Sequence, residues 1–259
     1  MARSTISRLV GILATTSFLS PTYAAFGASW DSLEDQNSPS YIISAVTTIR
    51  VPPKPAGGLI MLWPGLYTTE PDLVQTIIAS FANPTQDKQT YQGCNGKDSD
   101  WCVFASEYKG GSHNNVGSYA PVSKDDMVTI KYTYQEESQT WNQQALKNGV
   151  EISSFSSNAA QHAYRWGPYV ECQQQAEINN QPSPGHTYHN TKIVLNAPNP
   201  NYGQSLQKKY SHDTGFQTPD GGKTWQVATI WMETSPCAQT QLSDEAKQAR
   251  EQKQQRRRG

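Results

Sequence analysis

The sequence lacks the motifs on which most cofactor-dependent chemistry rests. It contains no glycine-rich phosphate loop, no dinucleotide-binding fingerprint and no G-x-S-x-G nucleophile elbow. Beyond the N-terminus it also lacks a long apolar run, and the one apolar stretch, residues 9–19, is about half as long as a membrane-spanning helix. We therefore expect no cofactor, no membrane anchor and no serine hydrolase of the elbow type.

Metal-binding residues are also few. His186 and His189 stand three residues apart, but in a Pro-Gly-containing loop, and the cysteines are better used in disulfides than as ligands. The acidic clusters at 97–100 and 124–126 lack the spacing of a calcium loop and favour ordinary turns. The sequence predicts no metal site.

Positive charge is scarce in the body of the chain. Residues 26–237 carry 13 basic and 19 acidic side chains, a formal charge of −6, and contain no basic stripe. This balance argues against nucleic acid as a partner. Residues 238–259 carry six basic and three acidic side chains and almost nothing apolar, so they predict a disordered charged tail. A solvated terminus is a better interpretation of that tail than a polyanion-binding segment.

The N-terminus has the order of a secretory signal. Arg3 and Arg8 precede the apolar stretch, and small residues follow it before Ala24 and Ala25. We interpret residues 1–25 as a signal peptide cleaved after Ala24 or Ala25, in preference to a short N-terminal core helix. The protein is then secreted and extracellular, with a single domain over 26–237 that we expect to be a monomer.

Four cysteines in a secreted chain favour two disulfides, for which three connectivities exist. Cys94 and Cys102 flank a turn-rich stretch and are close in sequence, so we pair them. Cys172 then pairs with Cys237 and closes the longer loop.

Short strands account for most of the remaining pattern. Residues 127–135 alternate between apolar and polar side chains, which is typical of a half-buried strand. Asn148 and Gly149 separate two further runs and predict a hairpin. Apolar or β-branched runs indicate about ten strands in all, at 41–51, 58–63, 73–81, 101–108, 127–135, 140–146, 150–155, 169–175, 192–196 and 224–232. The fold class is therefore an all-β antiparallel β-sandwich, with long polar loops at 83–100 and 179–189.

Two polar residues interrupt apolar strands and are candidates for chemistry. Gln75 lies in L-V-Q-T-I-I and Glu171 in Y-V-E-C. A carboxyl group beside aromatic side chains suits acid/base work, and a neutral amide can position a water molecule or an oxyanion. Strand alternation places Glu171 opposite Cys172, so Glu171 faces outward if Cys172 forms a core disulfide. The alternative interpretation is an ordinary solvated strand face.

The order of several short motifs resembles a known family. Residues 63–65 read W-P-G, 73–76 read L-V-Q-T, 122–128 read V-S-K-D-D-M-V, and a tryptophan at 166 precedes V-E-C at 170–172. This order is similar to W-x-G, L-Q-T-G, a G-D turn and A-E-W-I-V-E in secreted fungal glutamic peptidases. The resemblance implies a concanavalin A-like, jelly-roll type sandwich. It also implies an acid hydrolase in which Gln75 and Glu171 are catalytic and activate water to cleave a polypeptide.

The same sandwich type also suits other functions. Lectins and polysaccharide lyases use its concave face, and lyases need a Tyr or His base with an Arg to neutralise a uronate. Outside the signal and the tail the chain has two arginines, Arg50 and Arg165. A polysaccharide-binding or polysaccharide-cleaving protein is therefore the first alternative, and a non-catalytic secreted protein the second. For any of these, the residues expected to bind substrate are Trp63, Glu107, Trp166 and Tyr169.

Overall fold

The protein is an antiparallel β-sandwich. The computed structural model describes residues 25–32, 39–68, 72–81, 94–109, 112–157, 162–173 and 181–237, so the expected signal peptide and charged tail lie outside the described residues. The described chain forms fifteen strands and one short 3-10 helix, η2 (Tyr202–Ser205). Within these ranges no helix is long and apolar enough to cross a membrane.

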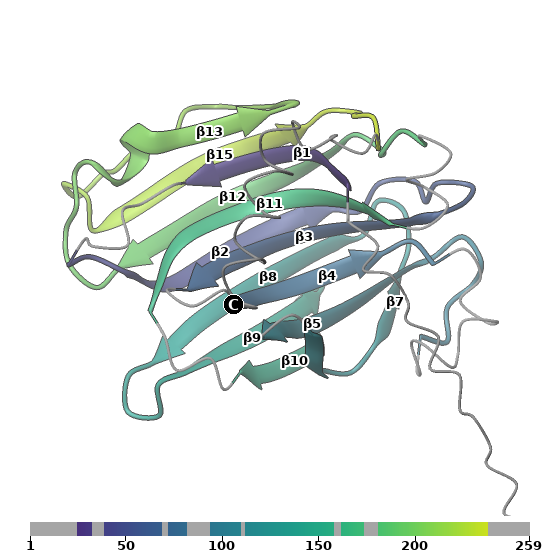
Figure 1. Cartoon of the computed structure of the whole chain (residues 1–259), viewed down its shortest axis with the longest axis horizontal. Helices are drawn as coiled ribbons and strands as arrows, with labels where there is room; N and C mark the ends of the chain where they lie inside the picture. Colours follow the sequence, from purple (N-terminus) through teal and green to yellow (C-terminus); the bar gives the residue numbers. More distant parts are fainter. Residues whose placement is uncertain are drawn as a thin grey trace, which may run out of the picture.

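Two sheets form the layers seen face on in Figure 1. In order, the first sheet contains β6 (Ser112–Val116), β5 (Trp101–Lys109), β4 (Leu73–Ala79), β3 (Leu59–Thr68), β11 (Ala163–Gln173), β1 (Ala25–Ser32) and β13 (Leu206–Lys209), with β7 (Ala120–Val122) beside β5. The second contains β10 (Val150–Ser157), β9 (Thr140–Lys147), β8 (Met127–Gln135), β2 (Ile42–Arg50), β12 (His186–Leu195), β15 (Thr224–Met232) and β14 (Ser211–Asp213). One residue pair, Ala163 with Ile42, joins β11 to β2 at the corner where the sheets meet.

The main core lies between the sheets and follows strand alternation. In β8, Val128, Ile130, Tyr132 and Tyr134 point inward and are buried, whereas the residues between them are exposed or half-buried. This is the pattern predicted for residues 127–135. The predicted hairpin is also confirmed, because Asn148 and Gly149 join β9 to β10 with φ angles of 53° and 80°. A turn with two positive φ angles matches the twist of the strands that it connects.

Both disulfides have the predicted connectivity. Cys94 pairs with Cys102 and Cys172 pairs with Cys237. The second bond joins residues 65 apart and ties the segment after β15 to β11. On a chain-entropy estimate, a loop of this length contributes about 4 kcal/mol of stability, and the shorter loop about half to two thirds of that.

Two central strands pass through proline, which the sequence patterns did not predict. The run before Pro64 was expected to end at Trp63, yet β3 continues to Thr68, and β11 passes through Pro168 directly opposite Pro64. Proline has no N–H to donate to a sheet ladder, so prolines are unusual in central strands. The paired ladder between β3 and β4 skips this position accordingly.

A tyrosine from the second sheet forms hydrogen bonds where the β3–β4 ladder is interrupted. Tyr132 on β8 donates its hydroxyl proton to the Pro64 carbonyl oxygen at 2.7 Å and accepts the Thr76 N–H at 2.8 Å. Tyr132 is fully buried, and burial raises the pKa of its hydroxyl well above the usual value. The two sheets are therefore joined by a hydrogen-bonded connection at the centre of β3 and β4, next to Gln75.

Candidate ligand-binding site

The first sheet has a second hydrophobic cluster on its outer face. Outward side chains of β3, β4, β5 and β11 form it, and its members include Met61, Trp63, Ile77, Phe104 and Tyr169. Outer faces of antiparallel sheets are commonly polar and solvated. The buried side chains of this cluster are at most 5% exposed, so this part of the outer face forms a second core and is not a free surface.

The two expected catalytic residues lie on this face but far apart. Gln75 on β4 is opposite Gly65 on β3, whereas Glu171 on β11 is opposite Met61 on β3. They are thus four residues apart along the strands and two strands apart across the sheet. With a rise of about 3.3 Å per residue and a spacing of about 4.8 Å per strand, their backbones are about 16 Å apart. The structure does not bring the pair within reach of one shared water molecule.

Each of the two residues has its own surroundings. Gln75 is 2% exposed, and its Oε1 atom is buried without a hydrogen-bond partner among the described residues. Glu171 accepts hydrogen bonds from the Trp63 indole N–H at 3.0 Å and from the Gln173 amide at 2.6 Å. Glu171 faces away from the core, as expected, because its neighbour Cys172 points inward. Its contacts are those of a carboxylate that orients a tryptophan.

Two of the four residues expected to bind substrate point the other way. Glu107 on β5 and Trp166 on β11 are 0% exposed and face the space between the sheets. Both belong to one row across the sheet, in which Val74 and Leu66 separate them. We expected Glu107 and Trp166 to bind substrate, but strand alternation directs both side chains inward, away from the face that carries Gln75 and Glu171.

The other two lie together with residues that sequence reasoning did not select. Trp63 and Tyr169 are opposite each other on β3 and β11, with ring centroids 4.5 Å apart. Tyr67 packs against both, at 6.4 Å from Trp63 and 5.6 Å from Tyr169. Arg165 places its guanidinium over the Tyr67 ring at 4.4 Å, a cation–π arrangement.

A buried aspartate holds Arg165 in place. Asp31 on β1 accepts hydrogen bonds from Nε of Arg165 at 2.6 Å and from Nη2, a two-point contact. Nε of Arg165 also lies 3.1 Å from the Tyr169 hydroxyl oxygen. The Asp31 side chain is 4% exposed and that of Arg165 is 34% exposed. The carboxylate is thus inside the protein, whereas part of the guanidinium reaches the surface.

The tyrosines of this cluster stay protonated. Burial, more than any other effect, raises the pKa of the Tyr67 hydroxyl to about 12, against the opposing effect of Arg165. Burial raises the pKa of Tyr169 further, and the nearby Tyr67 and Asp31 add to the effect. Both phenols therefore serve as neutral hydrogen-bonding groups and not as bases.

A pocket of about 350 Å³ opens above this cluster, and we call it the Arg165 groove. It is lined by Phe26, Ser29, Asp31, Tyr67, Arg165, Tyr169, Gln207, Lys208 and Lys209. The lining contains three cationic side chains and one carboxylate. Lys208 pairs with Asp213 at 2.7 Å, whereas Lys209 donates to the Phe26 carbonyl oxygen. The groove therefore carries a local excess of positive charge on an acidic domain.

The sequence contains a signal that points to Arg165. It is one of two arginines in the body of the chain, and it stands directly before Trp166. On β11 the row of Gln75 contains Gly167, because both are opposite Gly65 on β3, and Arg165 lies two residues away along the same strand.

Comparisons with known proteins give distant matches among solved structures. No family model matches the chain, and no curated protein sequence matches it. Two crystal structures of scytalido-glutamic peptidase with transition state analogues match with TM-scores of 0.46 and 0.44, at 11% and 12% identity. SCP-B, a member of the eqolisin family of peptidases in complex with a tripeptide, matches with a TM-score of 0.41 at 11% identity.

Each of these three matches covers 80% of this chain and 98% of the other. A prokaryotic β-1,3-1,4-glucanase (lichenase) from a mouse hindgut metagenome matches with a TM-score of 0.35 at 8% identity, covering 80% of this chain and 78% of the other. The glutamic peptidases are the family that the short motifs resemble. At these identities and TM-scores the matches carry no activity over to this chain.

Proposed function

We propose that this protein is a secreted glycan-binding protein whose Arg165 groove takes a carboxylate-bearing sugar unit. The observation that carries the proposal is the placement of Arg165 on the face of Tyr67, held by Asp31, in an open pocket with a positive lining. Of the functions considered from the sequence, acidic-glycan binding is the one that these contacts support best.

The charge of the groove favours an anion. A carboxylate accepts well-directed hydrogen bonds from a guanidinium, and the two-point contact with Asp31 uses only part of the five N–H groups of Arg165. Lys209, which donates to a backbone carbonyl oxygen, adds positive charge at the pocket, whereas the charge of Lys208 is balanced by Asp213. Because the domain as a whole is acidic, this excess is local and selects where an anionic ligand binds.

The aromatic and polar lining favours a sugar ring as the carrier of that carboxylate. Phe26, which is 42% exposed, and the half-buried Tyr67 provide apolar surface in this pocket. Ser29 and Gln207 offer both donors and acceptors for ring hydroxyls. A peptide carboxylate would bind Arg165 equally well, but a peptide offers fewer hydroxyl groups for hydrogen bonds with Ser29 and Gln207.

The geometry supports binding more than cleavage. Elimination at a uronate needs a base, and the two phenols beside Arg165 have raised pKa values and keep their protons. Acid hydrolysis by Gln75 and Glu171 needs the two groups on one water molecule, and they lie four residues and two strands apart.

The test compares an acidic with a neutral oligosaccharide by isothermal titration calorimetry. Tetragalacturonate should bind about tenfold more tightly than cellotetraose, and added salt should reduce the difference. The paired substitution Arg165→Gln with Asp31→Asn removes both charges together, so that no buried carboxylate is left without a partner. This variant should lose the preference for the acidic sugar.

A matched control uses an ion pair that lines neither this groove nor the pocket at the ends of β2, β12 and β15. Lys147→Gln with Asp126→Asn makes the same change at a partly exposed ion pair of the second sheet and should keep the preference. The basic tail is identical in both variants, so it cannot account for a difference between them. Equal affinity for both sugars contradicts the proposal. Peptide release in mild acid that is lost in Glu171→Gln would establish the hydrolase instead.

A further inference from the structure

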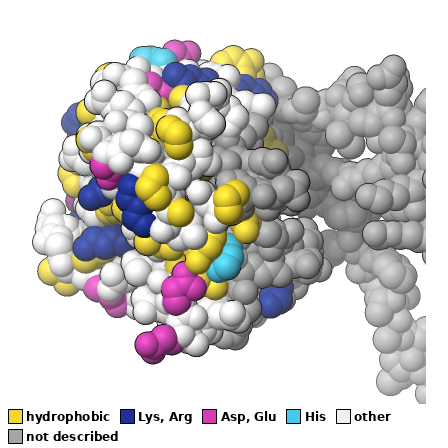
Figure 2. Space-filling model, turned by 90° about the vertical axis from the view of Figure 1, so that its left-hand side faces the viewer, with side chains coloured by type: hydrophobic (Ala, Val, Ile, Leu, Met, Phe, Trp, Pro, Cys, Tyr) yellow, Lys and Arg dark blue, Asp and Glu magenta, His cyan; other side chains and the backbone are white. Residues whose placement is uncertain are grey.

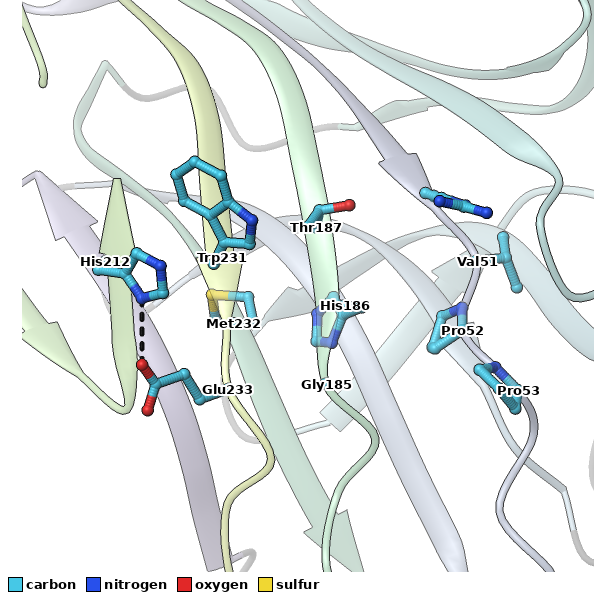
Figure 3. A pocket seen from close by; sticks show the side chains of 11 residues that line it. Val51, Pro52, Pro53, Gly185, His186, Thr187, His212, Trp231, Met232 and Glu233 are labelled. Carbon is cyan, nitrogen blue, oxygen red and sulfur yellow. Dashed lines mark hydrogen bonds and ion pairs between the residues drawn. The ribbon is translucent and has the colours of Figure 1, made fainter. Parts of the chain in front are cut away.

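A second pocket lies on the opposite side of the sandwich, at the outer face of the second sheet. Its volume is about 390 Å³, and its lining comes from the ends of β2, β12, β14 and β15 and the segments that follow or precede them (Figure 3). His212 and Trp231 stand on one side of β12, and Pro52 and Pro53 stand on the other (Figure 3). No residue of this pocket takes part in the Arg165 groove.

The pocket contains the one surface tryptophan of the protein. All seven tryptophans are described; Trp225 is 6% exposed and five others are at most 1% exposed, whereas Trp231 is 36% exposed. Exposing a large ring to water forgoes the free energy that burial provides, about 2 kcal/mol or more for an aromatic side chain. Trp231 is therefore the tryptophan whose ring a ligand can contact.

The strand register aligns the polar and aromatic side chains of this pocket. Arg50 on β2 is opposite Thr187 on β12, Thr187 is opposite Trp231 on β15, and Trp231 is opposite His212 on β14. These four side chains form one row across four neighbouring strands, and we call it the Trp231 row. Strand backbones hold them rigidly, so little conformational entropy is lost when a ligand binds.

The aromatic end of the row is a stacked pair of rings. The His212 and Trp231 rings have centroids 4.8 Å apart and planes 12° apart. Nδ1 of His212 donates to Glu233 at 3.1 Å, which fixes the imidazole ring (Figure 3). Because His212 covers one face of the Trp231 ring, the face of Trp231 that a ligand can use is the opposite one, towards Thr187 in the row.

The charged groups of the row already have partners. Arg50 forms an ion pair with Asp125 at 2.8 Å, and Glu233 accepts from His212. On the face of the molecule drawn in Figure 2, Lys and Arg side chains lie near Asp and Glu side chains, with hydrophobic side chains among them. The pocket thus presents no isolated charge, and the ligand that matches it is neutral.

We infer that the Trp231 row is a second binding site, and that it takes a neutral pyranose unit of a glycan. The apolar C–H face of the sugar stacks on the face of the Trp231 ring that His212 does not cover, as sugar and aromatic surfaces of similar size do when both lose water. Sugar hydroxyls accept from the remaining N–H groups of Arg50 and exchange hydrogen bonds with Thr187. Pro52 and Pro53 form the apolar wall at the other side of the pocket.

The test uses the full chain and cellotetraose, maltotetraose and chitotetraose as probes. Because the other tryptophans are buried, iodide should quench the fluorescence of Trp231 selectively, and a bound sugar should protect it. Trp231→Ala should weaken binding about tenfold, the loss expected for one stacking ring, and Trp231→Phe should restore most of it. Trp231→Phe should also remove the iodide-accessible fluorescence, which assigns the signal to this ring.

A surface aromatic outside the pocket provides the matched control. Tyr210 is 46% exposed and does not line the pocket, so Tyr210→Ala should leave sugar binding unchanged. The Trp231 variants should also keep any binding of tetragalacturonate at Arg165, which separates the two sites. The inference is overturned if none of the three neutral sugars binds at millimolar concentration, or if Trp231→Ala binds as tightly as the unchanged protein.

Discussion

The two arginine–aspartate pairs of the domain make the same contact in opposite surroundings. In the Arg165 groove, the Asp31 side chain is 4% exposed and the guanidinium lies on the Tyr67 ring. In the Trp231 row, the Arg50 and Asp125 side chains are 59% and 52% exposed. The first pair is partly buried and lines a pocket. The second pair lies on the surface, with Arg50 on the same row as the stacked Trp231 and His212 rings.

The difference in burial determines how much each ion pair matters for stability and how much of it a ligand can reach. An ion pair in water contributes little, because solvent screens both charges. A partly buried pair contributes little net stability either, but removing one member leaves the other as an uncompensated buried charge. We therefore expect the Arg165 groove to be sensitive to single substitutions and the Trp231 row to be tolerant of them.

The largest expected effect is the difference between Arg165→Gln and Arg50→Gln in the free energy of unfolding. Arg165→Gln should cost about 3 to 4 kcal/mol, because Asp31 stays buried without its cation. Arg50→Gln should cost less than about 1 kcal/mol. Urea unfolding followed by tryptophan fluorescence measures both. Adding Asp31→Asn to Arg165→Gln should restore a large part of the loss, and equal costs for the two arginine variants would contradict the comparison.

The next effect concerns the histidines at the Trp231 row. Burial lowers the pKa of His186 from 6.5 to about 4, despite a hydrogen bond to the Pro184 carbonyl oxygen that acts in the other direction. Between pH 6.5 and 4, His186 is protonated in the unfolded chain but neutral in the folded protein. The free energy of unfolding therefore falls as the pH drops towards 4. The loss amounts to about 3 kcal/mol in total and does not grow further below pH 4.

Thermal unfolding at a series of pH values in this window tests that prediction. His186→Gln should flatten the pH dependence, although it also changes the stability at neutral pH. An unchanged slope in His186→Gln would show that another group causes the acid sensitivity.

The smallest of the three effects concerns the tyrosine that joins the sheets beneath the outer cluster. Tyr132→Phe removes one hydroxyl and leaves the Thr76 N–H and the Pro64 carbonyl oxygen buried without this partner. We expect a cost of about 2 kcal/mol in the free energy of unfolding. Tyr41→Phe removes a hydrogen bond between an exposed hydroxyl and Glu136 and should cost about 0.5 kcal/mol in the free energy of unfolding. Hydrogen exchange at Thr76 should rise in Tyr132→Phe and stay slow in Tyr41→Phe.

Local sequence signals identified most of the long strands and both disulfides. The alternation in residues 127–135, the Asn148–Gly149 turn and the parity of the cysteines each depend on a few neighbouring residues, and each is confirmed. The strands that the patterns missed, β1, β6, β7, β13 and β14, are mostly short or polar and lack a clear period. Their place in the sheets depends on neighbours distant in sequence.

What the sequence alone determined is therefore the fold class, the disulfide pairs and the outward direction of Glu171. These follow from side-chain period and cysteine count, which are properties of short segments. Only the tertiary structure decided which side chains meet. Strand register separates Gln75 from Glu171, turns Glu107 and Trp166 inward, and brings Arg165 to Asp31 across 134 residues of sequence. Register is set by pairing between distant strands, and a shift of two residues would leave every local pattern intact while changing each of these contacts.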